Sequence, residues 1–224
     1  MSIITLTTDF GTKDHFIGSV KGALYSEISN VNIVDISNEI SPFNIIEGAY
    51  IIENSYKNFP EGSIHIIGVD SEKTPEKKHL VIKLDGHFFI CADNGIMSLI
   101  ANKIKPEKII EINIHNSSTS SFTVLDVFVK VAAHIYRGGS IDLVGKKINQ
   151  LKELYDINPI LNEKNKEIIG NVLYIDNYEN IVTNISKLVF EEFGKSRPFI
   201  INARNFQFNS IVNSYSNSIK FDVK

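Results

Sequence analysis

The feature that most constrains the fold is an alternation of strand-like and helix-like segments over the first two-thirds of the chain. Residues 3–9, "IITLTTD", form a β-branched apolar run, and apolar side chains recur at close to helical spacing in residues 15–28. Further strands are expected at 32–36, 63–70 and 108–114, and further helices at 43–59, 95–104 and 124–139. Strands that alternate with helices predict an α/β domain, in which helices cover both faces of a mainly parallel sheet.

Two local signals add detail to this region. The apolar runs 79–84 and 87–92 are separated only by Asp85 and Gly86, a pair typical of the type I′ turn of a β-hairpin. In the helix expected at 43–59, Asn44 is a plausible N-cap, with Glu47 three residues further on.

The pattern changes near residue 140, which indicates a second domain. Residues 154–167 are polar and contain Pro159, so we expect a linker or loop there. Short strands are expected at 168–176, 180–185, 197–203 and 206–216, with one short helix at 186–194. We therefore predict an α/β N-terminal domain over residues 1–158 and a small all-β, barrel-like C-terminal domain over residues 166–224.

Composition excludes several classes of protein. The 224 residues carry a net charge of −3, and the sequence shows no stripe of basic residues, so we expect no nucleic-acid partner. No apolar run approaches the roughly 20 residues of a membrane-spanning helix, and the N-terminus lacks the features of a signal peptide. The single cysteine, Cys91, cannot form an internal disulfide and is interpreted as a small buried hydrophobic residue. These features favour the cytoplasm.

Asp9, Phe10 and Gly11 spell the triplet that holds magnesium in protein kinases. Only eight residues precede it, so the glycine-rich loop, strand lysine and His-Arg-Asp motif of a kinase are missing. No Walker A or GxGxxG pattern occurs either. The six histidines include no His-x-His or His-x-x-x-His pair, so we expect no metal site.

Asp9 and Asp70 each end an expected strand of the parallel sheet. Ligands of open α/β sheets bind beyond the carboxyl ends of the strands, and a carboxylate there can accept bonds from two vicinal hydroxyls, such as those of a ribose. Alternatively, Asp9 caps the following helix or accepts backbone bonds in its own turn. The sequence leaves both interpretations open.

A third acid, Asp176, lies in "YIDNYENIVTNI" (174–185) between two expected strands. Asn180 offers the donor and acceptor that an adenine edge requires, and Tyr178 offers a stacking face. The alternative, which the residues alone favour, is a hairpin turn in which Asp176 and Asn180 serve the turn itself.

Taken in order, these stretches resemble one family, the S-adenosylmethionine (SAM) hydroxide adenosyltransferases, which are related to the SAM-dependent fluorinating and chlorinating enzymes. The resemblance covers roughly residues 3 to 215. It is carried by five segments: "ITLTTDFGTKDHFIGSVKGALY", "VDISNEISPFNIIEGAYII", "FPEGSIHIIGVD", "GHFFICADNG" and "YIDNYENIVTNI". The resemblance implies an α/β domain followed by a small β-barrel-like domain. It also implies a homotrimer whose sites lie between subunits.

The implied reaction is the attack of water at the ribose 5′ carbon of SAM, which releases adenosine and methionine. The sulfonium is already a good leaving group, so no metal or cofactor is expected. By resemblance, Asp9 binds the ribose hydroxyls and Phe43 lies against the ligand. Asp176 pairs with the ammonium of the methionine part, Tyr178 stacks near the adenine, and Asn180 hydrogen-bonds it.

The catalytic positions depart from the family pattern, which is an Asp-Arg-His triad that positions or activates the water. Asp70 matches the acid, Lys77 falls at the arginine position, and Thr123 falls at the histidine position. Lysine keeps the charge without the two-pronged guanidinium, and threonine can position a water but cannot take its proton. The chain also lacks the family's usual C-terminal continuation. Two functions therefore remain open: a SAM hydrolase that uses Asp70, Lys77 and Thr123, or a degenerate member that binds an adenosyl compound without turnover, as a sensor or an assembly subunit.

Overall fold

The computed structural model describes residues 2–101, 104–114, 122–154 and 158–213. The chain divides into two compact units, one made of residues 1–156 and 173–182 and the other of residues 157–172 and 183–224. The polar segment 116–121, which the sequence predicts to be a loop, lies outside the described residues, as does the chain from 214 onward. The domain limits of 1–158 and 166–224 stay a prediction.

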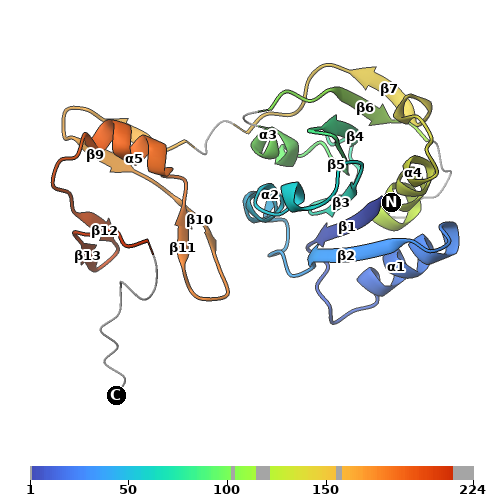
Figure 1. The fold of residues 1–224 in the computed structure, drawn as a ribbon, viewed down its shortest axis with the longest axis horizontal. Coiled ribbons are helices and arrows are strands. Elements are labelled where there is room, and N and C mark those ends of the chain that lie inside the picture. Colours follow the sequence, from blue (N-terminus) through green and yellow to red (C-terminus); the bar gives the residue numbers. More distant parts are fainter. Residues whose placement is uncertain (1, 102–103, 115–121, 155–157, 214–224) are drawn as a thin grey trace. The chain divides into compact units, whose positions relative to one another are not determined.

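A seven-stranded sheet forms the centre of the first unit (Figure 1). Its order is β2-β1-β3-β5-β4-β6-β7, and neighbouring strands are parallel from β2 to β5 and antiparallel from β5 to β7. The strands are β1 (Ile3–Thr8), β2 (Asn32–Ser37), β3 (Ile64–Gly68), β4 (His79–Leu84), β5 (His87–Ala92), β6 (Lys108–Ile112) and β7 (Gly145–Ile148). Only β4 and β7 run against the common direction, so the sheet is mainly parallel, as predicted.

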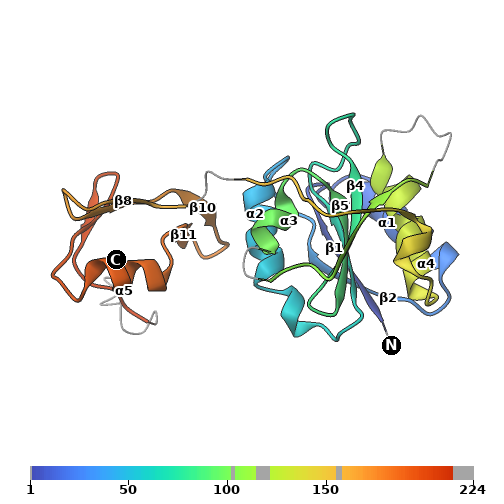
Figure 2. The same ribbon diagram turned by 90° about the horizontal axis from the view of Figure 1, so that it is seen from above.

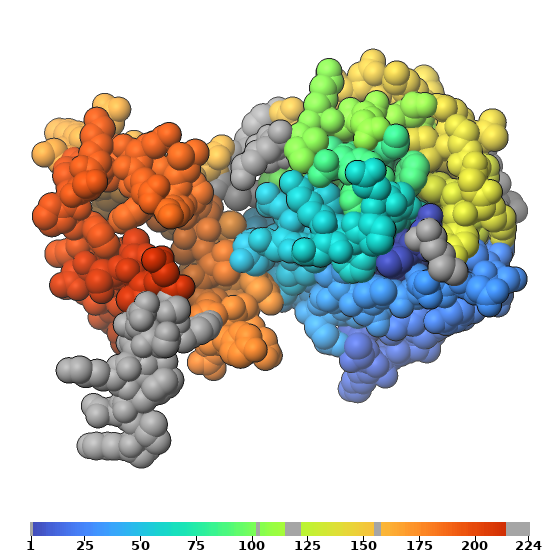
Figure 3. Space-filling view, in the orientation of Figure 1, coloured from blue at the N-terminus to red at the C-terminus, as the bar shows by residue number. Residues whose placement is uncertain are grey.

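Helices cover both faces of this sheet (Figure 2). Helices α1 (Phe16–Glu27) and α4 (Val129–Tyr136) pack on one face, where Leu24 and Val131 lie in the same core as Leu6. Helices α2 (Ile45–Glu53) and α3 (Ile96–Ile100) pack on the other face, with Ile52 and Ile96 in a second core. Figure 3 shows the side chains of α2 and α3 as one continuous surface. Because helices cover it on both sides, β3 is buried at every position and shows no alternation.

The predicted turn and helix start are both confirmed. Asp85 and Gly86 have φ of 52° and 76°, as a type I′ turn requires, and Leu84 pairs with His87 across it. The Asn44 side chain accepts a hydrogen bond from the backbone N–H of Glu47 and so caps α2. The helix expected at 124–139 begins with a π-helical turn, η2 (Val124–Phe128), before α4. Two short 3-10 turns, η1 (Tyr56–Asn58) and η3 (Ile141–Leu143), complete this unit.

Beyond residue 158 the chain forms three two-stranded sheets, which agrees with the expected small β-rich region. The pairs are β8 (Ile160–Asn162) with β9 (Glu167–Ile169), β10 (Val172–Ile175) with β11 (Ile181–Thr183), and β12 (Ile201–Ala203) with β13 (Phe206–Phe208). The linker expectation for 154–167 is wrong at Ile160–Asn162, because these residues pair with β9 across a tight turn. Ser186 caps the one helix, α5 (Lys187–Gly194). Of the strand expected at 206–216, the described part forms β13 only as far as Phe208, and residues 209–213 are not in a strand.

Burial differs sharply between the two regions. The sheet and its helices enclose two apolar cores, whereas no described residue from 151 to 213 is buried. Large apolar side chains stay exposed there, among them Ile160, Leu188, Ile200 and Phe206. Within the described part of the chain, no helix has the length and apolar character needed to cross a membrane.

Candidate active site

The ends of several strands meet at one edge of the sheet. Asp9 follows β1, Asp70 follows β3 by one residue, and Asn94 follows β5, so all three lie at the carboxyl edge of parallel strands. Strand β4 runs in the opposite direction, and its first residue, His79, therefore lies at the same edge. The topology places residues from four strands where α/β sheets bind ligands.

The Asp9 carboxylate joins segments that are far apart in the sequence. Its Oδ2 accepts hydrogen bonds from the backbone N–H of Phe43, at 2.9 Å, and from that of Asp70, at 3.2 Å. Helix α1 has His15 at its N-cap position and no side-chain cap, so Asp9 does not cap that helix. Asp9 accepts backbone bonds from two distant loops, not from its own turn. The second oxygen, Oδ1, has no hydrogen-bond partner among the described residues.

Both residues that donate to Asp9 have left-handed backbones. Phe43 has φ of 63° and Asp70 has φ of 44°. Non-glycine residues are uncommon in this region, and each such position costs of order 1–3 kcal/mol unless its surroundings hold it. The hydrogen bonds that both residues donate to Asp9 hold their backbones in this conformation. Gly11 also has a positive φ, 68°, and its N–H donates to the Asn38 carbonyl at 2.7 Å, which fixes the turn after Asp9.

Asp70 and Lys77 form an ion pair at the same edge. The Lys77 Nζ lies 2.5 Å from Asp70 Oδ1, and the two side chains are only 15% and 24% exposed. The loop between them turns at Thr74, whose N–H donates to the Lys77 carbonyl and whose hydroxyl accepts from the Lys77 N–H. These bonds direct the lysine back toward Asp70. In the described part of the chain, Asp70 Oδ2 has no partner, so it can accept a bond from a ligand or water.

Thr123 lies at the start of η2 and is buried. Its Oγ1 donates a hydrogen bond to the carbonyl of Ser71, the residue after Asp70, at 2.7 Å. The structure thus brings together Asp9, Phe43, Asp70, Lys77 and Thr123 around one strand end.

Sequence reasoning missed two residues at this edge. Asn94 donates through Nδ2 to the Val69 carbonyl at 3.0 Å and to the Asp70 carbonyl at 3.3 Å. Its position two residues after the buried strand β5 was a signal that could have identified it. His79, which the sequence placed only at the start of the strand run 79–84, lies in β4 with Nε2 3.0 Å from the Ser71 carbonyl.

The remaining predicted residues lie in the hairpin of β10 and β11. Asp176 Oδ1 accepts from the backbone N–H groups of Tyr178 and Asn180, both at 2.9 Å, and its Oδ2 accepts from Asn180 Nδ2 at 2.7 Å. The hydrogen bonds from Asn180 lower the pKa of Asp176 below its usual value, so the carboxylate stays ionised. The acid and the amide serve the turn, as the alternative interpretation held, while the Tyr178 ring is 79% exposed.

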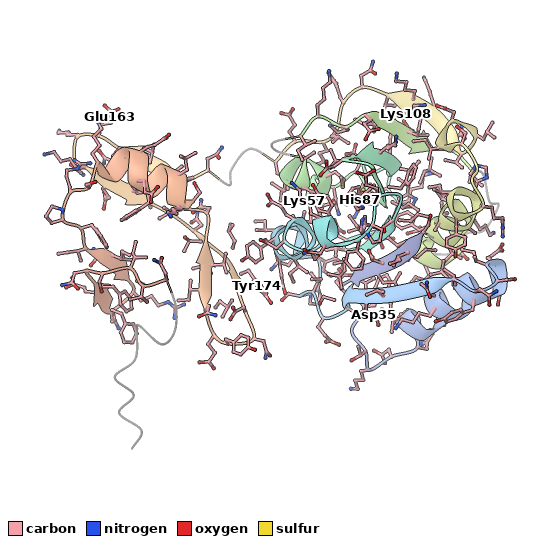
Figure 4. All side chains as sticks on the ribbon, viewed as in Figure 1. Asp35, Lys57, His87, Lys108, Glu163 and Tyr174 are labelled. Carbon is pink, nitrogen blue, oxygen red and sulfur yellow. The ribbon has the colours of Figure 1, made fainter. Side chains whose placement is uncertain are left out.

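No group of three or more His, Cys, Asp or Glu side chains could hold a metal among the described residues. Two histidines do meet in the interior: His65 Nε2 lies 3.1 Å from Nδ1 of His87, which is labelled within the first unit in Figure 4. Cys91 is fully buried, as predicted, and burial raises the pKa of its thiol well above the usual range.

Comparison with known proteins agrees with this architecture. Residues 4–145 match the SAM hydroxide adenosyltransferase N-terminal domain, and residues 170–220 match the C-terminal domain of the same family. The chain is 34% identical over 193 residues to an (R)-S-adenosyl-L-methionine hydrolase of Methanocaldococcus jannaschii, covering 84% of this chain and 68% of that protein. It is 20% identical over 222 residues to a fluorinase of Nocardia brasiliensis, covering 86% of this chain and 74% of that enzyme.

A solved structure shares the fold. The crystal structure of an uncharacterized conserved protein from Thermotoga maritima superposes with a TM-score of 0.83 at 25% sequence identity, over 97% of this chain and 85% of that one. Two domain matches in the expected order, a relative at 34% identity and a shared fold lead to one conclusion: the chain belongs to the SAM hydroxide adenosyltransferase family.

Proposed function

We propose that this protein hydrolyses S-adenosyl-L-methionine to adenosine and L-methionine. The observation that carries the proposal is the 34% identity to a protein named as an (R)-S-adenosyl-L-methionine hydrolase, in a chain that matches both domains of the family. The acids and the lysine at the sheet edge support it, because they supply acceptors and a cation where a polar ligand would bind.

In this reaction the oxygen of water bonds to the ribose 5′ carbon while the bond from that carbon to sulfur breaks. The electron pair of the broken bond neutralises the sulfonium, and one proton is released. The site must hold the water behind the 5′ carbon and remove competing solvent. Because the sulfonium is a good leaving group, we propose that no cofactor takes part.

We assign a role to each residue from the contacts at the carboxyl edge of the sheet. Oδ1 of Asp9 is available to accept from the ribose hydroxyls while Oδ2 holds the Phe43 loop, which presents its ring beside them. Oδ2 of Asp70 accepts a bond from the attacking water, and Lys77 holds the carboxylate in place. Thr123 fixes the strand end from which Asp70 projects.

We further propose that the β10–β11 hairpin completes the site through Asp176, Tyr178 and Asn180, and that the protein is a homotrimer with sites at subunit interfaces. The large apolar side chains exposed beyond residue 158 support an assembly, because a stable monomer rarely leaves so many uncovered. Sedimentation equilibrium tests this part; a monomer at micromolar concentration would contradict it. A reducing compartment such as the cytoplasm suits the single cysteine.

The decisive experiment incubates purified protein with SAM in ¹⁸O-labelled water and measures adenosine and methionine by mass spectrometry. Adenosine carrying ¹⁸O at the 5′ hydroxyl identifies water as the nucleophile. Asp70→Asn should slow its release roughly tenfold or more, whereas Glu72→Gln, an exposed acid two residues away, should not. Tight binding of SAM without adenosine release would favour the non-catalytic alternative, and no binding of any adenosyl compound would exclude both.

A further inference from the structure

Three consecutive carbonyls at the end of β3 are held by side chains from other elements. Asn94 donates to the carbonyls of Val69 and Asp70, and Ser71 is held in turn by two donors. The Thr123 hydroxyl donates to the Ser71 carbonyl at 2.7 Å, and His79 Nε2 lies 3.0 Å from the same oxygen. The backbone that carries Asp70 is therefore fixed on both sides.

The His79 contact is a hydrogen bond of defined direction. A carbonyl oxygen only accepts, so the ring proton of His79 must sit on Nε2. The imidazole is 2% exposed and packs edge-on against Phe128 at 4.9 Å between ring centroids. Burial, together with the nearby charges of Lys73 and Lys77, lowers the pKa of His79 to about 4, although the bond to Ser71 opposes that shift. A neutral donor thus holds the carbonyl near neutral pH.

Because His79 lies on β4, its hydrogen bond to Ser71 bears on the ion pair of Asp70 and Lys77. Lys77 ends the loop two residues before His79, which is the first residue of β4. The loop from Asp70 to Lys77 is thus anchored at its start by the Ser71 carbonyl and at its end by the strand that carries His79. One side chain fastens the two ends of the loop to each other.

We propose that His79 is a positioning residue for hydrolysis, which sets the relation between the Asp70 carboxylate and the Lys77 amine by fastening Ser71 to β4. This inference rests on the proposed function, since it concerns the same site. In this proposal His79 acts through the backbone of the loop, by its hydrogen bond to the Ser71 carbonyl.

The test compares His79→Leu with His79→Gln. Leucine keeps an apolar side chain against Phe128 and removes the donor, whereas the amide of glutamine can restore a donor at similar reach. We expect His79→Leu to lower kcat roughly tenfold with little change in KM for SAM, and His79→Gln to recover most of the loss. His79→Leu should also speed amide hydrogen exchange in residues 71–78, and His79→Gln should not.

A matched control exists in the same chain. His134 also places Nε2 against a serine carbonyl, that of Ser140 at 2.9 Å, but at the end of α4 away from the sheet edge. His134→Leu should leave kcat unchanged. Because Thr123 still holds Ser71 in His79→Leu, the melting temperature should stay within a few degrees of the parent, so a loss of kcat does not reflect unfolding.

The outcomes separate the two proposals. Parent protein that releases no adenosine overturns the proposed function and this inference with it. Active parent protein with a His79→Leu variant of equal kcat and equal exchange in residues 71–78 overturns the role of His79 alone. A kcat loss that His79→Gln fails to recover, with unchanged exchange, also overturns it, because the donor would then not be the cause.

Discussion

Acid should destabilise this protein through His65, which lies in the interior with an exposed fraction of 1%. Its Nδ1 is 2.7 Å from the Thr5 hydroxyl and its Nε2 is 3.1 Å from His87 Nδ1, so a neutral ring satisfies both bonds. Burial, with a smaller effect of His87, lowers the pKa of His65 from 6.5 to about 3. Between these values the unfolded chain binds a proton that the folded chain does not, so the free energy of unfolding falls as pH falls.

The size of the effect follows from the two pKa values. At pH 5 the unfolded histidine is almost fully protonated and the folded one is not, so His65 alone costs about 2 kcal/mol relative to pH 7.5. The loss begins below about pH 6.5 and continues toward pH 3. With a urea slope of about 2 kcal/mol/M, this corresponds to a midpoint shift of roughly 1 M.

The assay is urea unfolding of the parent and of His65→Gln at both pH values. The chain contains no tryptophan, so circular dichroism and tyrosine fluorescence report the transition. The parent should lose about 2 kcal/mol more than His65→Gln between pH 7.5 and pH 5, whatever the variant costs at neutral pH. His15→Gln, which changes an exposed histidine, should follow the parent. Equal losses in the parent and in His65→Gln would refute the reasoning.

Three further experiments, with five variants, test the site and the fold. Asp9→Ala removes the acceptor of two backbone N–H groups and should lower the free energy of unfolding by roughly 3 kcal/mol in urea; a loss below about 1 kcal/mol would contradict the linking role. Lys77→Met should reduce kcat roughly tenfold or more in the adenosine assay while Lys77→Arg keeps most activity, and equal rates would exclude a role for the charge. Gly145→Ala should lower the free energy of unfolding by roughly 3 kcal/mol, because the new Cβ would lie 1.9 Å from the Glu111 carbonyl oxygen. Gly18→Ala, in helix α1, should raise it by about 0.5–1 kcal/mol, because the new Cβ would have nothing within 4 Å. Equal melting temperatures in those last two variants would contradict the packing argument.

Local sequence signals predicted the elements whose structure depends on residues close to one another in the sequence. The β-branched runs, the Asp85-Gly86 turn and the Asn44 cap depend on neighbouring residues, and each was found. Strand β7 was missed because Lys146 and Lys147 give it no apolar pattern. It forms by pairing with β6, a contact distant in sequence that no local window contains.

The same distinction applies to the candidate active site. The carboxyl-end rule predicted that Asp9 and Asp70 lie at one edge of the sheet, as they do, because strand ends can be read from the sequence. The Asp85-Gly86 signal predicted that β4 runs antiparallel to β5, but the position of β5 between β3 and β4 could not be read from the sequence. Yet this arrangement brings His79 and the loop of Lys77 to the site. At Asp176 the ambiguity was real, because the residues suited to a ligand also make the turn.

The Asp85-Gly86 turn lies at the opposite end of β4 from Asp70, yet it controls how the site is aligned. Its two residues fix Leu84 opposite His87, and that register continues along six residues, roughly 20 Å, to His79 opposite Ala92. A register shift of one residue, caused by one residue added to the turn, would send every side chain of the strand to the other face of the sheet. His79 would then turn away from Ser71, and the loop that carries Lys77 would lose this attachment. The hairpin therefore sets the position of His79 along the sheet. The alignment of the polar site at one edge of the sheet depends on the number of residues in the turn at the other edge.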